Sequence, residues 1–127
     1  MEDSRNSIRS RCPVFRAGGR SRDGVYLPDY RGPRAVASIT ACYQSLNLQN
    51  HFSHNLVLEP PSDPEIWRQL IGRTARQGQR AARVTVDVVV NCEAAARSLR
   101  TALDRARLVL QNTGKTNPLL QLENTQW

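Results

Sequence analysis

Two arginines spaced three residues apart, Arg73 and Arg76, are the side chains in this sequence best suited to chemistry. A planar guanidinium can grip phosphate oxygens at two points, and a well-placed arginine stabilises the negative charge that grows during phosphoryl transfer. Their spacing predicts that both lie with Gln69 on one face of a helix over residues 63–77, where side chains three and four apart are neighbours. Gly72 beside them would let a ligand approach closely. The same spacing also fits a solvated amphipathic helix with ordinary surface arginines.

The segment from residue 69 to residue 79 resembles motif VI, the arginine-finger motif of superfamily-two helicases and DNA translocases, notably their remodeller-like branch. The matching positions are Gln69, Gly72, Arg73, Arg76, Gly78 and Gln79. In that family the two arginines reach across a cleft to a nucleotide held by the first motor lobe. The resemblance therefore implies that Arg73 and Arg76 are catalytic fingers. The nucleotide-binding residues that it implies are Gln69, Gly72, Arg73 and Arg76.

A second match lies upstream, where residues 45–49 (Ser-Leu-Asn-Leu-Gln) resemble the Gly-Leu-Asn-Leu core of motif V. In the family this loop contacts the nucleic-acid backbone and couples it to ATP, which implies nucleic-acid contacts by Ser45, Leu46 and Asn47. Residues 42–45 are Cys, Tyr, Gln and Ser, where the family has glycines or other small residues. These larger side chains would crowd a backbone meant to approach phosphate. The alternative interpretation is a plain loop after a strand.

Two parts of a complete ATPase motor are missing from the sequence. It contains no GxxxxGK[ST] phosphate loop and no DExx-type acidic box after a strand. By the resemblance, ATP with its Mg²⁺ would be held by a first RecA-like lobe, located in another chain or in upstream sequence. We therefore expect no ATP hydrolysis by this chain alone.

The hydrophobic pattern alternates strands with helices from residue 35 onward. Short apolar runs predict strands at 35–41, 55–58 and 83–90, the last with its valines on one face. Helices are predicted at 63–77 and 93–112. The core side of the second is predicted to contain Leu99, Leu103, Ala106 and Leu110. This order predicts an α/β fold with a parallel sheet of about three strands and flanking helices, and the resemblance implies that the sheet is a partial RecA-like one.

The composition divides the chain into three parts. Residues 1–34 form an arginine-rich, mostly irregular leader, with at best a short strand at 25–27. Residues 35–114 are the part that, by the resemblance, would form the partial helicase C-terminal lobe, and the resemblance itself covers about residues 35–112. Residues 115–127 form a polar tail that is expected to fray.

The charge of the chain favours an anionic partner. The formal net charge is +7, and Lys115 is the only lysine among 18 basic residues. Such a charge predicts a nucleic acid as the partner, and the resemblance to the remodeller-like branch implies that it is DNA. A GC-rich coding bias would give the same excess of arginine.

Several other classes of protein are not predicted. No apolar run of about 18 residues exists to span a membrane, and the N-terminus has no secretory signal core, so we expect a cytoplasmic or nuclear protein. Three scattered cysteines without a CxxC pair predict neither a disulfide framework nor a zinc ribbon. His51 and His54 have no partners at ligand spacing, so no metal site is predicted.

The sequence thus predicts a C-terminal helicase-lobe fragment. It would supply arginine fingers and a motif V-like loop to an ATP-dependent helicase or DNA translocase, and it would be inactive alone. Two alternatives remain open. The chain could be a non-catalytic module that binds nucleic acid through its arginines, or an interaction module whose basic leader docks an acidic protein.

Overall fold

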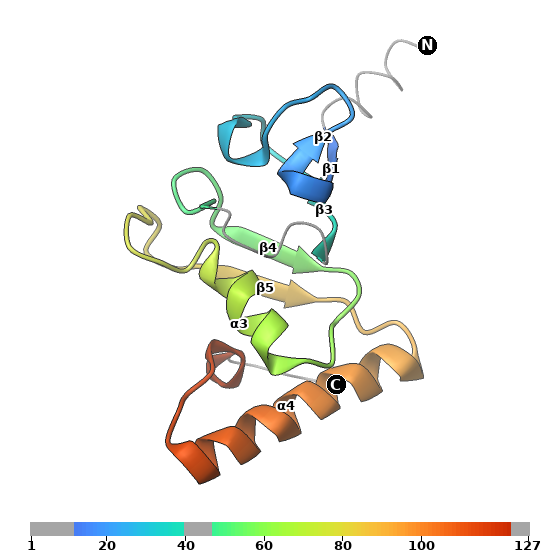
Figure 1. Ribbon diagram of the computed structural model, residues 1–127, viewed down its shortest axis with the longest axis vertical. Helices are drawn as coiled ribbons and strands as arrows, with labels where there is room; N and C mark the ends of the chain where they lie inside the picture. Colours follow the sequence, from blue (N-terminus) through green and yellow to red (C-terminus); the bar gives the residue numbers. More distant parts are fainter. Residues whose placement is uncertain (1–11, 40–46, 123–127) are drawn as a thin grey trace.

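The computed structural model of the chain describes residues 12–39 and 47–122 and is a mixed α/β structure (Figure 1). Its elements are β1 (Val14–Arg16), η1 (Ala17–Gly19), β2 (Arg20–Ser21), η2 (Leu27–Asp29), β3 (Val36–Ala37), β4 (His54–Val57), α3 (Pro64–Gly72), β5 (Thr85–Val88), α4 (Glu93–Thr113) and η3 (Pro118–Gln121). They form a mixed three-stranded sheet, β2-β1-β3, and a parallel pair, β4-β5. The first sheet lies at one end of the molecule and α4 at the other, with β4, β5 and α3 between them.

Strands β4 and β5 pair in parallel along their length, with His54 opposite Thr85 at one end. Val86 and Val88 pack on the core while Thr85 and Asp87 are exposed, so the alternation predicted along β5 is confirmed. The core on the inner side of this pair is formed by Val57, Trp67, Ile71, Leu99, Ala102, Leu103 and Leu119.

Helix α3 begins where the sequence predicts it. Asp63 is the cap, and its Oδ1 accepts the N–H of Glu65 at 2.9 Å. Pro64 occupies the first turn, where a backbone N–H has no acceptor within the helix, so the absence of this N–H in proline costs no hydrogen bond. Trp67 is completely buried, and its indole nitrogen donates to a main-chain carbonyl at 2.7 Å.

Helix α4 runs one residue past its predicted end and stops at Gly114, whose φ of 73° lies in the left-handed region that glycine adopts freely. Its buried side chains are Leu99, Ala102, Leu103 and Ala106. Leu110 is 37% exposed. Its predicted core position is wrong because residues 107–113 are all exposed, so the last two turns lie outside the core. No helix among the described residues is long and apolar enough to cross a membrane.

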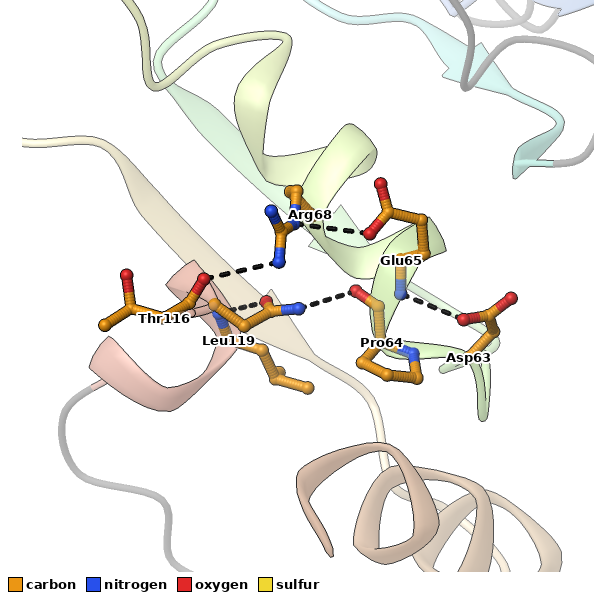
Figure 2. A network of polar contacts seen from close by, with 7 residues as sticks. Asp63, Pro64, Glu65, Arg68, Thr116 and Leu119 are labelled. Carbon is orange, nitrogen blue, oxygen red and sulfur yellow. Dashed lines mark hydrogen bonds and ion pairs between the residues drawn. The ribbon is translucent and has the colours of Figure 1, made fainter. Parts of the chain in front are cut away.

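The tail after α4 folds back onto α3, so the prediction of fraying is wrong for its described part. Leu119 of η3 is buried in the core. The buried Asn117 fixes this arrangement, because its Nδ2 donates to the Pro64 carbonyl oxygen at 2.9 Å and its Oδ1 accepts the Leu119 N–H at 3.0 Å. Arg68 adds a bond from Nη2 to the Thr116 carbonyl oxygen at 3.3 Å (Figure 2).

The strand predicted at 35–41 is only partly observed and belongs to another sheet. Strand β3 pairs in parallel with β1, not with β4 or β5. The prediction of one parallel sheet of about three strands is therefore wrong, because the parallel sheet formed by β4 and β5 has only two strands. The cause is a nonlocal partner, since the Val36 N–H donates to the Pro13 carbonyl oxygen and the Ser38 N–H donates to that of Phe15. Residues 40 and 41 lie outside the described part of the chain.

Residues 12–37, here called the N-terminal unit, fold around the buried side chains of Phe15 and Leu27. Strand β1 pairs antiparallel with β2. Tyr26 makes a single bridge to β2, and η2 begins directly after it, so the short strand expected at 25–27 amounts to that one bridge.

Residues 47–53, the bridging loop, connect the two halves. Leu48 and Phe52 pack against the small cluster of the N-terminal unit. His51 Nε2 lies 2.7 Å from the Gly32 carbonyl oxygen. The loop is therefore held on one side by the N-terminal unit, and its other side meets the turn that follows α3.

Candidate functional site

The chain leaves α3 through residues 73–83, here called the arginine turn. The carbonyl oxygen of Arg73, which would continue the helix, accepts the N–H of Leu48 at 3.0 Å. The carbonyl oxygen of Thr74 accepts the side-chain Nε2 of Gln79, also at 3.0 Å. Because both acceptors bond to groups outside the helical ladder, α3 ends five residues before its predicted end at residue 77.

The helical face predicted for Gln69, Arg73 and Arg76 is therefore not formed. Gln69 is half-buried on α3, whereas both arginines follow the helix end. Arg73 is only 4% exposed, and Arg76 lies at the surface. Gly72 ends α3, and nothing lies within 4 Å of where a Cβ would stand, so the space beside it is open. Of the two predicted fingers, only Arg76 reaches solvent.

Arg76 meets the bridging loop. Its Nη1 donates to Asn47 Oδ1 at 2.5 Å. Together with the bond from the Leu48 N–H to the Arg73 carbonyl oxygen, this contact puts the motif V-like and motif VI-like segments side by side. Ser45 and Leu46, the other two predicted nucleic-acid contacts, lie outside the described residues.

Gln79 organises the turn, a role that the sequence marks only by its place in the motif. Its Nε2 donates to the carbonyl oxygens of Phe52 and Thr74, at 2.8 and 3.0 Å. Its Oε1 accepts the N–H of Ala81 at 3.1 Å. Thr74 is 1% exposed, and its hydroxyl accepts Nδ2 of Asn55 at 2.9 Å. The side-chain amide of Gln79 thus connects the bridging loop to both ends of the arginine turn. The bond from Asn55 to Thr74 ties the turn to β4, and nothing in the local sequence pattern predicts it.

The arginine turn is strongly basic. The sequence from Glu65 to Asp87 contains five arginines and no carboxylate between those two residues. Arg76, Arg80 and Arg83 are exposed, and none of the three makes an ion pair with a described residue. Guanidiniums whose charge is not neutralised attract anions, and their fork matches the oxygens of a phosphate. The turn is therefore a surface that can bind phosphate groups.

No set of metal ligands accompanies this surface within residues 12–39 and 47–122, where no three His, Cys, Asp or Glu side chains are grouped to hold an ion. His54 and Asp87 are paired on the outer face of β4-β5, with Nε2 and Oδ2 2.6 Å apart. Both are well exposed, and two groups alone do not make a coordination site.

A hollow of about 250 Å³ lies at the N-terminus of α3, against the end of α4. Asp63, Glu65, Arg68 and Lys115 are among its lining residues. Arg68 Nε pairs with Glu65 Oε2 at 3.3 Å, and Asp63 caps the helix (Figure 2). Asp63 and Glu65 are thus engaged within α3, and Arg68 joins this helix to the tail through the Thr116 carbonyl oxygen.

Comparisons of the chain with protein-family models, with curated proteins and with solved structures found no match. The features from which a function is inferred are therefore the arginine turn, the bridging loop and the contact between them.

Proposed function

We propose that this chain is the C-terminal part of the second RecA-like lobe of a superfamily-two helicase or DNA translocase. In this role Arg76 stabilises the charge on a phosphate that another lobe holds. The bridging loop at Asn47 contacts the backbone of a nucleic acid, most simply DNA. ATP and Mg²⁺ belong to the first lobe, since this chain has no phosphate loop.

The observation that carries this function is the hydrogen bond between Asn47 and Arg76. The two residues come from the two segments that resemble consecutive motor motifs, and 29 positions separate them in the chain. A direct contact between a nucleic-acid loop and an arginine finger is what coupling of nucleic-acid binding to ATP hydrolysis would require. The exposed arginines at 76, 80 and 83 supply the charge.

Arg73 takes a different part from the one that helical spacing suggests. With 4% of its surface exposed, its side chain is buried, and its carbonyl oxygen accepts the Leu48 N–H. We assign it as a positioning residue, which keeps the turn and the bridging loop together. Arg76 is the finger.

The test is complementation in trans. The chain is titrated into purified first lobes, with phosphate loop and acidic box, of the helicase-type motors of the same organism, and ATP hydrolysis is followed with and without DNA. We expect DNA-stimulated hydrolysis with a cognate lobe, reduced by roughly 10³-fold or more in Arg76→Ala, which is the range for loss of an arginine finger.

Arg97→Ala is the matched control, because Arg97 is an exposed arginine of α4 that pairs with Glu93. It removes the same charge from a surface with no part in the proposed site, and we expect full stimulation. Failure of every first lobe to respond, or equal activity of the Arg76 and control variants, would contradict the helicase function. The chain alone is expected to release no phosphate.

The burial of Arg73 favours a second candidate function, a non-catalytic module that binds nucleic acid through its arginines. Only one of the two predicted fingers is exposed, and a phosphate-binding turn needs neither a nucleotide nor a partner lobe. Salt-dependent nucleic-acid binding without any response from a first lobe would select this candidate. Loss of binding in an Arg80→Gln/Arg83→Gln variant would then identify the turn as the contact.

A further inference from the structure

The N-terminal unit is a second basic part of the chain, and it lies at the opposite end of the molecule from α4 (Figure 1). Its sequence holds five arginines against two aspartates, a net charge of +3. All five arginines are exposed and lie outside the segment that resembles the motor family. Arg16 belongs to β1, and the other four follow η1. They are Arg20, Arg22, Arg31 and Arg34.

Two of the four guanidiniums are held in place by main-chain carbonyls rather than by carboxylates. Arg20 Nη1 donates to the Gly24 carbonyl oxygen at 3.2 Å, and its guanidinium carbon lies 5.3 Å from the centre of the Tyr26 ring. Arg31 Nη1 donates to the carbonyl oxygens of Pro28 and Tyr30, at 2.7 and 3.2 Å. Carbonyl bonds orient a guanidinium without neutralising it, so both side chains keep their full charge.

The aspartates of the unit do not compensate this charge. Among the described residues, neither Asp23 nor Asp29 lies in an ion pair. Arg22 and Arg34 make no hydrogen bond or ion pair with any residue that the structure describes. In both Arg20 and Arg31 the bonds to described residues use only Nη1. The Nε and Nη2 donors remain for a ligand, and this fork is what a phosphate accepts.

The scaffold under these side chains is ordered by its own small core. Phe15 and Leu27 are buried, and the rings of Phe15 and Tyr30 lie 5.5 Å apart. The tight turn between β2 and Tyr26 is closed by bonds between Ser21 and Val25. A set of arginines on a fixed scaffold loses little freedom on binding a regular polyanion.

We propose that the N-terminal unit is a second nucleic-acid-binding surface, which contacts the phosphates of a single strand through Arg20, Arg22, Arg31 and Arg34. Several guanidiniums on one small unit fit a ligand with repeated phosphates. The stack of Arg20 on Tyr26 adds a planar surface for a base, the combination typical of single-strand binding. This surface is independent of the helicase function, because its four arginines precede residue 35, where the resemblance begins, and because it involves neither Arg76 nor a partner lobe.

The test compares Arg20→Gln/Arg31→Gln with Arg97→Gln/Arg107→Gln, which removes the same charge from arginines of α4 that pair with carboxylates. Glutamine keeps a donor for the carbonyl bonds. Binding of the full chain to a labelled single strand of about 20 nucleotides, long enough for one site, is measured by anisotropy between about 50 and 200 mM salt. Loss of two phosphate contacts lowers the salt slope by about 1.4, which is about sevenfold in affinity over that range.

We expect this change in the N-terminal variant and an unchanged slope in the α4 variant. Arg22→Gln/Arg34→Gln removes side chains that hold no described contact, so it should give the same loss with folding intact. Unchanged slopes in both N-terminal variants would overturn the inference, as would an equal change in the α4 variant. Tighter binding to a duplex or to polyglutamate, with the same dependence on Arg20 and Arg31, would also overturn it. Arg76→Gln, measured in parallel, reports on the arginine turn separately.

Discussion

Two of the four arginines of α4 pair with carboxylates, whereas Arg20 and Arg31 on the N-terminal unit and Arg76 on the arginine turn make no ion pair with a described residue. Arg97 pairs with Glu93 one helical turn away, and Arg107 pairs with Asp104. Arg31 bonds to carbonyl oxygens and Arg76 to an amide oxygen. A carboxylate next to an arginine offsets its charge, whereas arginines held by neutral acceptors retain their charge for a ligand. The difference separates Arg97 and Arg107 from the guanidiniums that are available for binding.

The first prediction concerns the core on which the α4 side depends. Trp67→Ala removes a completely buried ring and its hydrogen bond. We expect the free energy of unfolding to fall by about 3–5 kcal/mol, measured by urea denaturation. Leu108→Ala, at a side chain 55% exposed, should change it by less than about 0.5 kcal/mol. Equal effects of the two substitutions would mean that this core does not hold the helices.

The second prediction concerns the tail, which belongs to the same half of the molecule. Leu119 is 1% exposed and packs in the core beside α3 and α4. Leu119→Ala should lower stability by about 2–5 kcal/mol. Leu110→Ala, on the exposed end of α4, serves as the matched control and should be nearly neutral. A neutral Leu119 variant would show that the tail is not part of the folded unit.

The third prediction concerns the scaffold of the arginine turn. Gln79→Ala removes two bonds to carbonyl oxygens and one from an N–H group. We expect a loss of about 1–3 kcal/mol and faster hydrogen exchange of the Leu48 amide. Gln77→Ala alters an exposed residue of the same turn, and it should change neither the free energy of unfolding nor the hydrogen exchange of the Leu48 amide. Protection of Leu48 that survives in the Gln79 variant would contradict the part given to this amide.

The smallest effect is expected from the paired arginines. Arg97→Gln/Arg107→Gln breaks two exposed ion pairs within α4. Such pairs contribute about 0–1 kcal/mol, so the melting temperature should hardly move and nucleic-acid binding should stay the same. A clear loss of binding would abolish the distinction between neutralised and available arginines.

Local signals predicted the parts of the fold that local physics fixes. The alternation of valines along β5, the Asp63 cap of α3 and the glycine that ends α4 all concern neighbours in sequence. The parts that the sequence did not predict depend on distant partners. Strand β3 pairs with β1, and η3 packs on α3, although neither contact has a periodic signature.

The candidate site divides in the same way. The types and spacing of Arg73 and Arg76 are visible in the sequence, but the end of α3 is not. It depends on the Leu48 N–H, which comes from a loop about two dozen positions upstream and occupies the Arg73 carbonyl oxygen. The bridging by Gln79 uses that same loop, through the Phe52 carbonyl oxygen, and Arg73 at the end of the helix is buried. A helical-wheel projection cannot predict these two features, because it assumes that the helix continues through residue 77.

The most direct test of the arginine turn as a phosphate-binding surface is the salt dependence of nucleic-acid binding in Arg76→Gln/Arg80→Gln. Glutamine at position 76 keeps a donor for Asn47, so the contact with the bridging loop can persist while the charge is removed. For a single strand we predict a salt slope lower by about 1.4 than that of the unaltered chain, with no change in Arg97→Gln/Arg107→Gln. Identical slopes for the turn variant and the unaltered chain would contradict the account.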